Sequence, residues 1–167
     1  MLVPSSQEPI LFKANISDLP LLELLVKAYN KALSEYDDGT PPKDIEYLRA
    51  NIARNDHLIL VVKLGNKAAG FILAKRISDS SPSAWLLSEI FVVEKFQRQK
   101  IGLKIVTQLW NQYPGCWKLY VRPNNIKALN FWRKTISFYT NNNFDETVQN
   151  LGNPFKPKKR IVFDVNT

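Results

Sequence analysis

The chain has 167 residues, of which 45% are hydrophobic, and a formal net charge of +8. This length fits one ordinary domain with its own core, and the hydrophobic content excludes a disordered chain. A single cysteine, Cys116, and a single histidine, His57, exclude an internal disulfide and a Cys/His zinc cluster. We therefore expect residues 1–167 to form one domain without a metal.

No hydrophobic run approaches the roughly 20 residues that a membrane-spanning helix needs, and the N-terminus lacks the pattern of a signal peptide. We expect a soluble, cytoplasmic protein with no membrane partner. The positive charge is concentrated, because residues 91–134 hold nine basic side chains and one acidic side chain. A compact anionic ligand and a nucleic acid both fit such a segment, since each presents phosphates to cations.

Hydrophobic periodicity predicts an α/β protein with a mixed sheet of about six or seven strands and about four helices. Ser17 is expected to cap the first helix, and proline is expected to open the second. The predicted elements in chain order are a strand at 10–14, helices at 17–36 and 42–55, strands at 57–64, 67–77 and 84–93, a helix at 102–113, a strand at 116–121, a helix at 124–136, and strands at 143–150 and 158–165.

The strands at 84–93 and 116–121 should lie parallel, because a crossover helix joins them. Between the first strand and that helix stands QRQKIG, residues 97–102. A helix N-terminus leaves about four N–H groups without intrahelical partners, and these groups attract anions. Arg98, Lys100 and Lys104 would add positive charge beside them. The turn is therefore a predicted diphosphate site.

This turn resembles the acyl-CoA-binding motif of the GCN5-related N-acetyltransferases, the GNAT superfamily. The motif reads glutamine or arginine, two variable residues, glycine, one variable residue, then glycine or alanine. Gln97 and Gly102 match its ends, while Lys100 replaces the middle glycine.

A second segment, VRPNNIKALNFW, resembles a later part of the same family. Asn125, Ala128 and the pair Phe131-Trp132 stand at the family's spacing. The family usually ends this pair with tyrosine, a common acid for the departing thiolate. Trp132 cannot act as that acid, because an indole N–H is only a hydrogen-bond donor.

The resemblance implies a GNAT-type sheet and the transfer of an acetyl group from acetyl-CoA to a primary amine of a small molecule or protein. It implies no metal and no nucleic acid as primary partner, and it allows a homodimer. The alternative is a catalytically silent acyl-CoA-binding module or sensor. The residues implied to contact acetyl-CoA are Phe91, Val92, Val93, Gln97, Arg98, Gln99, Lys100, Ile101, Gly102, Leu103, Asn125, Phe131 and Trp132.

Glu89 is the predicted catalytic residue. A carboxylate among hydrophobic neighbours is costly to bury, and the resemblance implies a general base on this strand. The alternative is a carboxylate that faces solvent or pairs with a nearby Arg or Lys. A backbone N–H of Val92 or Val93 would polarise the thioester carbonyl.

Three further features leave alternatives open. The leaving thiolate could take a proton from Tyr139, Tyr120 or water, or depart without an acid. Asp37 and Asp38 could receive a cationic amine, although a solvated turn is the simpler interpretation. The basic loop at 150–160 would instead favour an anionic group on the acceptor.

Overall fold

The computed structural model describes residues 7–36, 41–77, 84–155 and 158–167. Seven strands form one sheet in the order β1-β2-β3-β4-β5-β7-β6, and every pair is antiparallel except β4 with β5. The strands are β1 Pro9–Lys13, β2 His57–Leu64, β3 Lys67–Ile77, β4 Ala84–Val92, β5 Cys116–Val121, β6 Phe144–Asn150 and β7 Lys159–Asn166. This mixed sheet confirms the predicted fold class.

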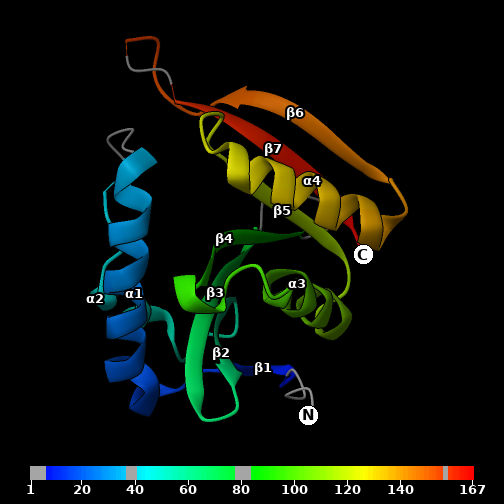
Figure 1. Ribbon diagram of the computed structural model, residues 1–167. Helices are drawn as coiled ribbons and strands as arrows, with labels where there is room; N and C mark the ends of the chain where they lie inside the picture. The colour runs from blue at the N-terminus through cyan, green and yellow to red at the C-terminus, as the bar shows by residue number, and fades with distance from the viewer. Residues whose placement is uncertain (1–6, 37–40, 78–83, 156–157) are drawn as a thin grey trace.

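Four α-helices flank the sheet within the described ranges. The helices are α1 Leu19–Leu33, α2 Ile45–Asn51, α3 Ile101–Gln112 and α4 Ile126–Thr140, with short 3₁₀ turns η1 Ile16–Asp18, η2 Ser34–Tyr36 and η3 Glu94–Phe96. Figure 1 shows α1 and α2 on one face of the sheet and α3 and α4 on the other. No described helix is both long and hydrophobic enough to span a lipid bilayer.

Two hydrophobic cores follow from the alternation of the central strands. On β2, Leu58 and Leu60 pack in the core beneath α3 and α4, while Ile59 and Val61 pack in the core beneath α1 and α2. Side chains of a strand alternate between its faces, so a strand covered on both sides is hydrophobic throughout. The central strands therefore hold the two helical layers in a fixed relation.

The starts of the first two helices differ from their predictions. Asn15, and not Ser17, makes the first cap: its side chain accepts the Ser17 N–H at 2.8 Å and opens η1. Asp44 accepts the Glu46 N–H at 3.1 Å, so α2 begins after the prolines rather than with one. In both cases the short polar side chain that reaches the free N–H groups fixes the helix start.

Strands β4 and β5 separate partway along their length. Their parallel pairing is confined to Trp85, Leu86 and Leu87 opposite Trp117, Lys118 and Leu119. Beyond Leu87, β4 continues for five residues along β3 alone. The sheet thus opens at the carboxyl ends of its two parallel strands, where ligands collect in open α/β sheets.

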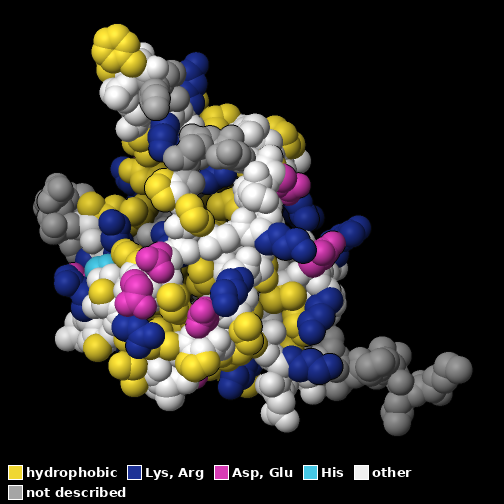
Figure 2. Space-filling view, turned by 90° about the vertical axis from the view of Figure 1, so that its left-hand side faces the viewer, with side chains coloured by type: hydrophobic (Ala, Val, Ile, Leu, Met, Phe, Trp, Pro, Cys, Tyr) yellow, Lys and Arg dark blue, Asp and Glu magenta, His cyan; other side chains and the backbone are white. Residues whose placement is uncertain are grey.

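The face covered by α1 and α2 carries charges of both signs. Figure 2 shows Lys and Arg side chains interspersed with Asp and Glu side chains and with hydrophobic groups. The end of the β6–β7 hairpin protrudes beyond this face at the top of the view (Figures 1 and 2).

Candidate active site

A β-bulge in β4 sets the direction of Glu89. Glu89 is opposite Leu73, and Leu87 is opposite Ala74, so Ser88 is an extra residue in the strand. Without the bulge, Glu89 would face the same core as Trp85 and Leu87. The extra residue turns Glu89 toward the face covered by α1, as bulges near functional sites commonly do.

Two side chains hold the Glu89 carboxylate. The Tyr29 hydroxyl, on α1, donates a hydrogen bond to Glu89 Oε2. Lys43 Nζ lies 3.2 Å from Glu89 Oε1, and the two side chains are 23% and 21% exposed, respectively. The sequence allowed Glu89 either to face solvent or to pair with a nearby Arg or Lys, and the structure shows the ion pair. This pair lies in a half-buried site and not on the open surface.

Tyr29 can act only as a hydrogen-bond donor to Glu89 at neutral pH. Its burial, the adjacent Glu89 charge and the hydrogen bond to Glu89 raise the pKa of Tyr29 well above its usual value of about 10. Its ring packs edge-on against Phe71 and Phe91. The phenol is thus fixed in place and stays protonated.

A cavity of about 470 Å³ opens over this cluster. It is lined by α1, the segment at 41–43, β4, β5, α4 and the start of β7. Its described charged lining residues are Glu89, Lys43, Arg122 and Arg160. Of the predicted site residues, Glu89, Asn125 and Trp132 meet here, while Asp37 and Asp38 lie outside the described residues.

The turn at 97–102 leads from β4 into α3 and uses two of its side chains to shape itself. Gln97 donates to the Val92 carbonyl at 2.8 Å and accepts from Lys127 Nζ at 3.0 Å. Gln99 donates to the Lys95 carbonyl at 3.1 Å. These side chains stabilise the turn itself, so an anion bound here would contact the backbone and the exposed cations.

The first backbone N–H groups of α3 and α4 differ in whether a side chain caps them. At α4, Asn125 caps the helix and accepts the Ala128 N–H at 3.0 Å. At α3 the N-cap residue is Lys100, which makes no side-chain capping hydrogen bond. The first N–H groups of α3 are therefore available to an anion, whereas one in α4 is already bonded.

Gly102 lies close to the Phe131 side chain of α4. A Cβ at this position would lie 2.9 Å from Phe131 Cε2, because the Phe131 ring covers the first turn of α3. Ile101 is buried in the core, and Leu103 is half-buried. Ile101 could therefore contact a ligand through its backbone but not through its side chain.

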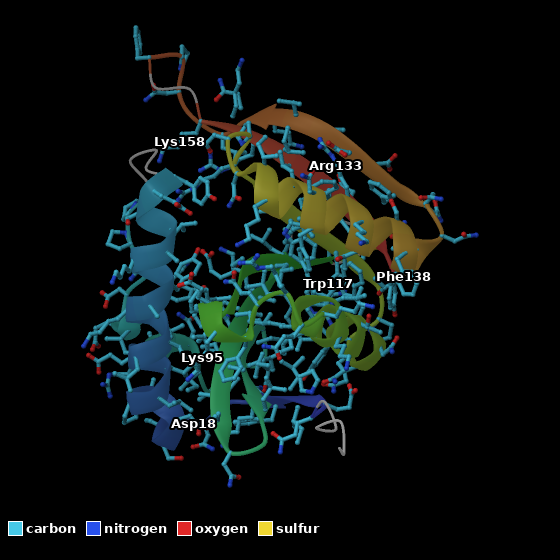
Figure 3. All side chains as sticks on the ribbon, in the orientation of Figure 1. Asp18, Lys95, Trp117, Arg133, Phe138 and Lys158 are labelled. Atoms are coloured by element: carbon cyan, nitrogen blue, oxygen red, sulfur yellow. The ribbon has the colours of Figure 1, made fainter. Side chains whose placement is uncertain are left out.

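Figure 3 shows the surroundings of this site. Lys95 lies beside the turn into α3, Trp117 lies between α3 and α4, and Lys158 lies above the C-terminal end of α1. The start of β7 and the end of α1 thus border the same open side of the molecule, at which Arg160 lines the cavity.

A sequence model of the Acetyltransferase (GNAT) family matches residues 21–138. The chain belongs to this family. Membership confirms the prediction of an acetyl-CoA-dependent N-acetyltransferase, with acetyl-CoA as the acyl donor. No curated protein matches the sequence.

Solved GNAT structures have the same fold. The microcin C7 self-immunity acetyltransferase MccE, in complex with acetyl-CoA and AMP, aligns over 99% of this chain and 98% of its own with a TM-score of 0.73 and 15% identity. An acetyltransferase from Thermus thermophilus aligns over 97% and 99% with a TM-score of 0.72 and 15% identity. The ribosomal-protein-S18-alanine N-acetyltransferase from Escherichia coli aligns over 95% and 93% with a TM-score of 0.68 and 16% identity.

Lys100, which replaces the middle glycine of the GNAT motif, has a left-handed backbone conformation of the kind that favours glycine. Its φ is +60° and its ψ is 14°, and Arg98 also has a φ of +59°. A side chain in this left-handed region costs roughly 1–2 kcal/mol. Left-handed residues in a turn build the concave arrays of N–H groups that bind anions. The backbone at Lys100 is therefore one that a glycine could also adopt, and the turn fits a diphosphate.

The alternation of hydrogen bonds along β4 separates two candidate donors. The Val93 N–H donates to the Ala69 carbonyl at 2.8 Å, so it is already used. In an antiparallel pair, alternate residues direct their N–H and C=O groups to opposite neighbours. The backbone N–H and C=O groups of Ile90 and Val92 therefore point toward the opening between β4 and β5, whereas those of Phe91 point toward β3. Of the two candidates, only the Val92 N–H points into this opening, and the backbone of Ile90 points there as well.

The two tyrosines considered for the leaving group are also distinguished. Tyr120 lines the cavity. Tyr139 donates to Asn111 Oδ1 at 2.6 Å, away from the cavity-lining residues. Trp132 occupies the GNAT tyrosine position and is buried at 5% exposure. Tyr120 is therefore the tyrosine that can reach a group bound in the cavity.

Sequence reasoning did not assign a role to several residues of the cavity. The sequence placed Tyr29 only within the predicted helix at 17–36 and Lys43 only near the start of the predicted helix at 42–55. Arg122 follows β5, and its guanidinium donates to the Tyr36 carbonyl at 2.6 Å. Among the described residues, no group of three or more His, Cys, Asp or Glu side chains could hold a metal ion. The prediction that the full chain needs no metal stays a prediction.

Proposed function

We propose that this chain, as a single domain over residues 1–167, transfers an acetyl group from acetyl-CoA to a primary amine of a small molecule or protein. The observation that carries the proposal is the Glu89 carboxylate, which faces the cavity at the point where β4 and β5 separate. Acetyl-CoA would supply the activated acyl group. The residues of the chain would bind it, orient the amine and remove the amine's proton.

The donor would be held mainly by the backbone. The first N–H groups of α3, with Arg98 and Lys100 nearby, would bind the diphosphate. Lys104, which the sequence also suggested, instead pairs with Glu8, whose Oε1 lies 2.6 Å from its Nζ. Ile90 would offer strand-like hydrogen bonds to the pantetheine arm in the opening beside β4. The Val92 N–H would stabilise negative charge on the carbonyl oxygen.

The acceptor would be handled mainly by side chains. An amine enters as an ammonium ion, and Glu89 would accept its proton directly or through water. Tyr29 would keep one carboxylate oxygen fixed, because its hydroxyl already donates to Oε2. Holding amine and thioester together can supply roughly 7–11 kcal/mol in favourable cases. Tyr120 or water would protonate the leaving sulfur.

The test is the release of CoA thiol in the presence of a panel of amines that includes small diamines, aminoglycosides and peptides with free N-termini. Calorimetry with acetyl-CoA is run in parallel on the same preparation. We expect binding of acetyl-CoA and amine-dependent thiol release that Glu89→Gln slows by about 100-fold or more. Glu89→Gln should still bind acetyl-CoA, which makes it the matched control.

One outcome would favour the alternative function of a silent acyl-CoA-binding module. Trp132 stands where GNAT members usually have a tyrosine, and both Glu89 oxygens already have partners within the chain. Tight binding of acetyl-CoA without thiol release for any amine would support this module and contradict the proposed transfer.

A further inference from the structure

Lys43 places a primary amine inside the proposed acceptor cavity. Its Nζ lies 3.2 Å from Glu89 Oε1, and its side chain is only 23% exposed. Glu89 is the group that we assign to receive the acceptor's proton. A general base acts on an amine within hydrogen-bond reach, directly or through one water. Lys43 therefore stands where the ammonium group of an acceptor would have to bind.

The position of Lys43 is fixed by contacts on three sides. The Asn30 side chain donates to the Lys43 carbonyl at 2.8 Å and accepts its N–H at 2.9 Å. The Lys43 ammonium also lies 5.1 Å from the centroid of the Tyr47 ring, within the range of a cation–π contact. Asn30 thus fixes the Lys43 backbone, and contacts with Tyr47 and Glu89 hold the ammonium group, so this lysine differs from a freely extended surface side chain.

We propose that Lys43 is a self-acetylation site, modified by the chain's own acyl transfer when no acceptor is bound. This inference rests on the proposed function, because it uses the same base and the same acyl donor. It assigns to the segment at 41–43 a role in the reaction beyond lining the cavity.

The chemistry balances with acetyl-CoA as the co-reactant. Glu89 takes a proton from the Lys43 ammonium, and the freed nitrogen lone pair forms a bond to the thioester carbonyl carbon. The nitrogen then loses its second proton and the carbon–sulfur bond breaks. Sulfur leaves with the electron pair and takes up that second proton, directly or through water. The products are Nε-acetyl-lysine at position 43 and CoA.

The modification would change how Glu89 meets an acceptor. Acetylation removes the positive charge of Lys43 and with it the ion pair to Glu89 Oε1. That oxygen then becomes free to receive the ammonium of an incoming amine. Unmodified Lys43 competes with the acceptor, and acetyl-Lys43 does not.

The experiment follows the covalent state of the full chain by mass spectrometry after incubation with acetyl-CoA alone. Trypsin does not cut after acetyl-lysine, so the modified peptide spans residues 32–49 instead of ending at Lys43. We expect one acetyl group per chain on that peptide, and a rate that Glu89→Gln lowers by about 100-fold or more.

Two lysine variants control for location and for charge. Lys43→Arg keeps a cation beside Glu89 but cannot act as a nucleophile, because arginine stays protonated. It should gain no acetyl group on this peptide. Lys27 forms a similar ion pair with Glu23 at 3.1 Å, but on the exposed surface of α1. Its acetylation in the wild-type chain gives the background rate, and Lys27→Arg should leave the labelling of Lys43 unchanged.

The outcomes separate this inference from the proposed function. Acetylation of Lys43 well above the Lys27 background, dependent on Glu89, supports it. If the chain acetylates an amine of the panel while Lys43 stays at background, the inference is wrong and the proposed function stands. If acetyl-CoA binds but neither Lys43 nor any amine is acetylated, both are wrong.

Discussion

The two ends of the proposed site are built from different parts of the chain. At the donor end, the first turn of α3 has no side-chain cap, and Gln97 and Gln99 are used to brace the turn. At the acceptor end, the side chains of Tyr29, Lys43 and Glu89 bind one another. The donor end therefore relies on backbone N–H groups, and the acceptor end relies on side-chain chemistry.

This difference determines how each end should respond to substitution. A backbone site tolerates many side chains provided that the backbone conformation is kept, as Lys100 in a left-handed conformation illustrates. A side-chain site loses its function with one atom or one charge. Substitutions at the two ends should therefore separate rate from donor affinity.

The largest effect is expected at the acceptor end. Glu89→Gln removes the proton acceptor and keeps the shape of the side chain, so kcat should fall by about 10²–10⁴-fold. The dissociation constant for acetyl-CoA should change by less than about threefold, well under 1 kcal/mol. Steady-state kinetics and calorimetry on one preparation check both numbers. A variant with normal kcat would remove Glu89 from the mechanism.

The next effect concerns stability. Tyr29→Phe keeps the ring contacts with Phe71 and Phe91 but loses the hydrogen bond to the Glu89 carboxylate. Hydrogen bonds to charged groups contribute about 1.5–3 kcal/mol, and the free energy of unfolding should fall by that amount at pH 8. Urea denaturation of the two chains measures it. Equal stability would mean that this hydrogen bond contributes nothing to folding.

The same pair of proteins tests the raised pKa of Tyr29. Above about pH 10 the tyrosine ionises in the unfolded chain but stays protonated in the folded chain. The unfolded state then binds fewer protons, so stability falls as pH rises. The Tyr29→Phe variant has no tyrosine to ionise at this position and therefore lacks this loss of stability. The difference in the free energy of unfolding between the two proteins should therefore shrink from pH 8 to pH 11. A constant difference would contradict the raised pKa of Tyr29.

A packing change at the donor end comes third. Gly102→Val forces atoms into the Phe131 ring and should cost about 1–3 kcal/mol of stability. It should also weaken acetyl-CoA binding, because the first turn of α3 must move away from α4. Gly102→Ala adds only the Cβ, and the higher helix propensity of alanine offsets part of the clash with Phe131, so both effects should be much smaller than in Gly102→Val. Two variants with wild-type melting temperature and affinity would contradict this packing.

The smallest expected effect is an increase in stability. Lys100→Gly relieves a left-handed lysine and should raise stability by about 1 kcal/mol or less, because glycine's extra freedom in the unfolded chain offsets part of the relief. Lys104→Gly, inside α3, should instead lower stability by about 1 kcal/mol. Acetyl-CoA affinity should stay within a few-fold in Lys100→Gly. A loss of more than about 100-fold would make the lysine charge, not the backbone, the main contact.

The fold and the donor end were predictable because their signals are local in the sequence. The strands β2, β3 and β5 have the predicted bounds, since their short hydrophobic segments end sharply at turns. Likewise QRQKIG and the Asn125 cap are short segments whose function depends on neighbouring backbone groups. The helix starts were missed by a few residues, because several short polar side chains compete for the same N–H groups.

The acceptor end was not predictable to the same degree. Tyr29, Lys43 and Glu89 come from three separate segments, and only the folded chain brings them together. The bulge at Ser88 reverses the face of Glu89, and nothing in a continuous hydrophobic strand marks such an extra residue. From the sequence we could therefore consider that Glu89 pairs with some Arg or Lys, but we could not identify Lys43 as the partner.

Acetyl-CoA binding, as proposed, depends most on the free N–H groups at the start of α3. Titration of acetyl-CoA into the isotope-labelled chain, followed by amide NMR, tests them directly. We predict the largest shift changes at Ile101, Gly102 and Leu103, and smaller changes at Ala128, whose N–H already donates to Asn125. Unchanged α3 amides at saturating acetyl-CoA would contradict the account.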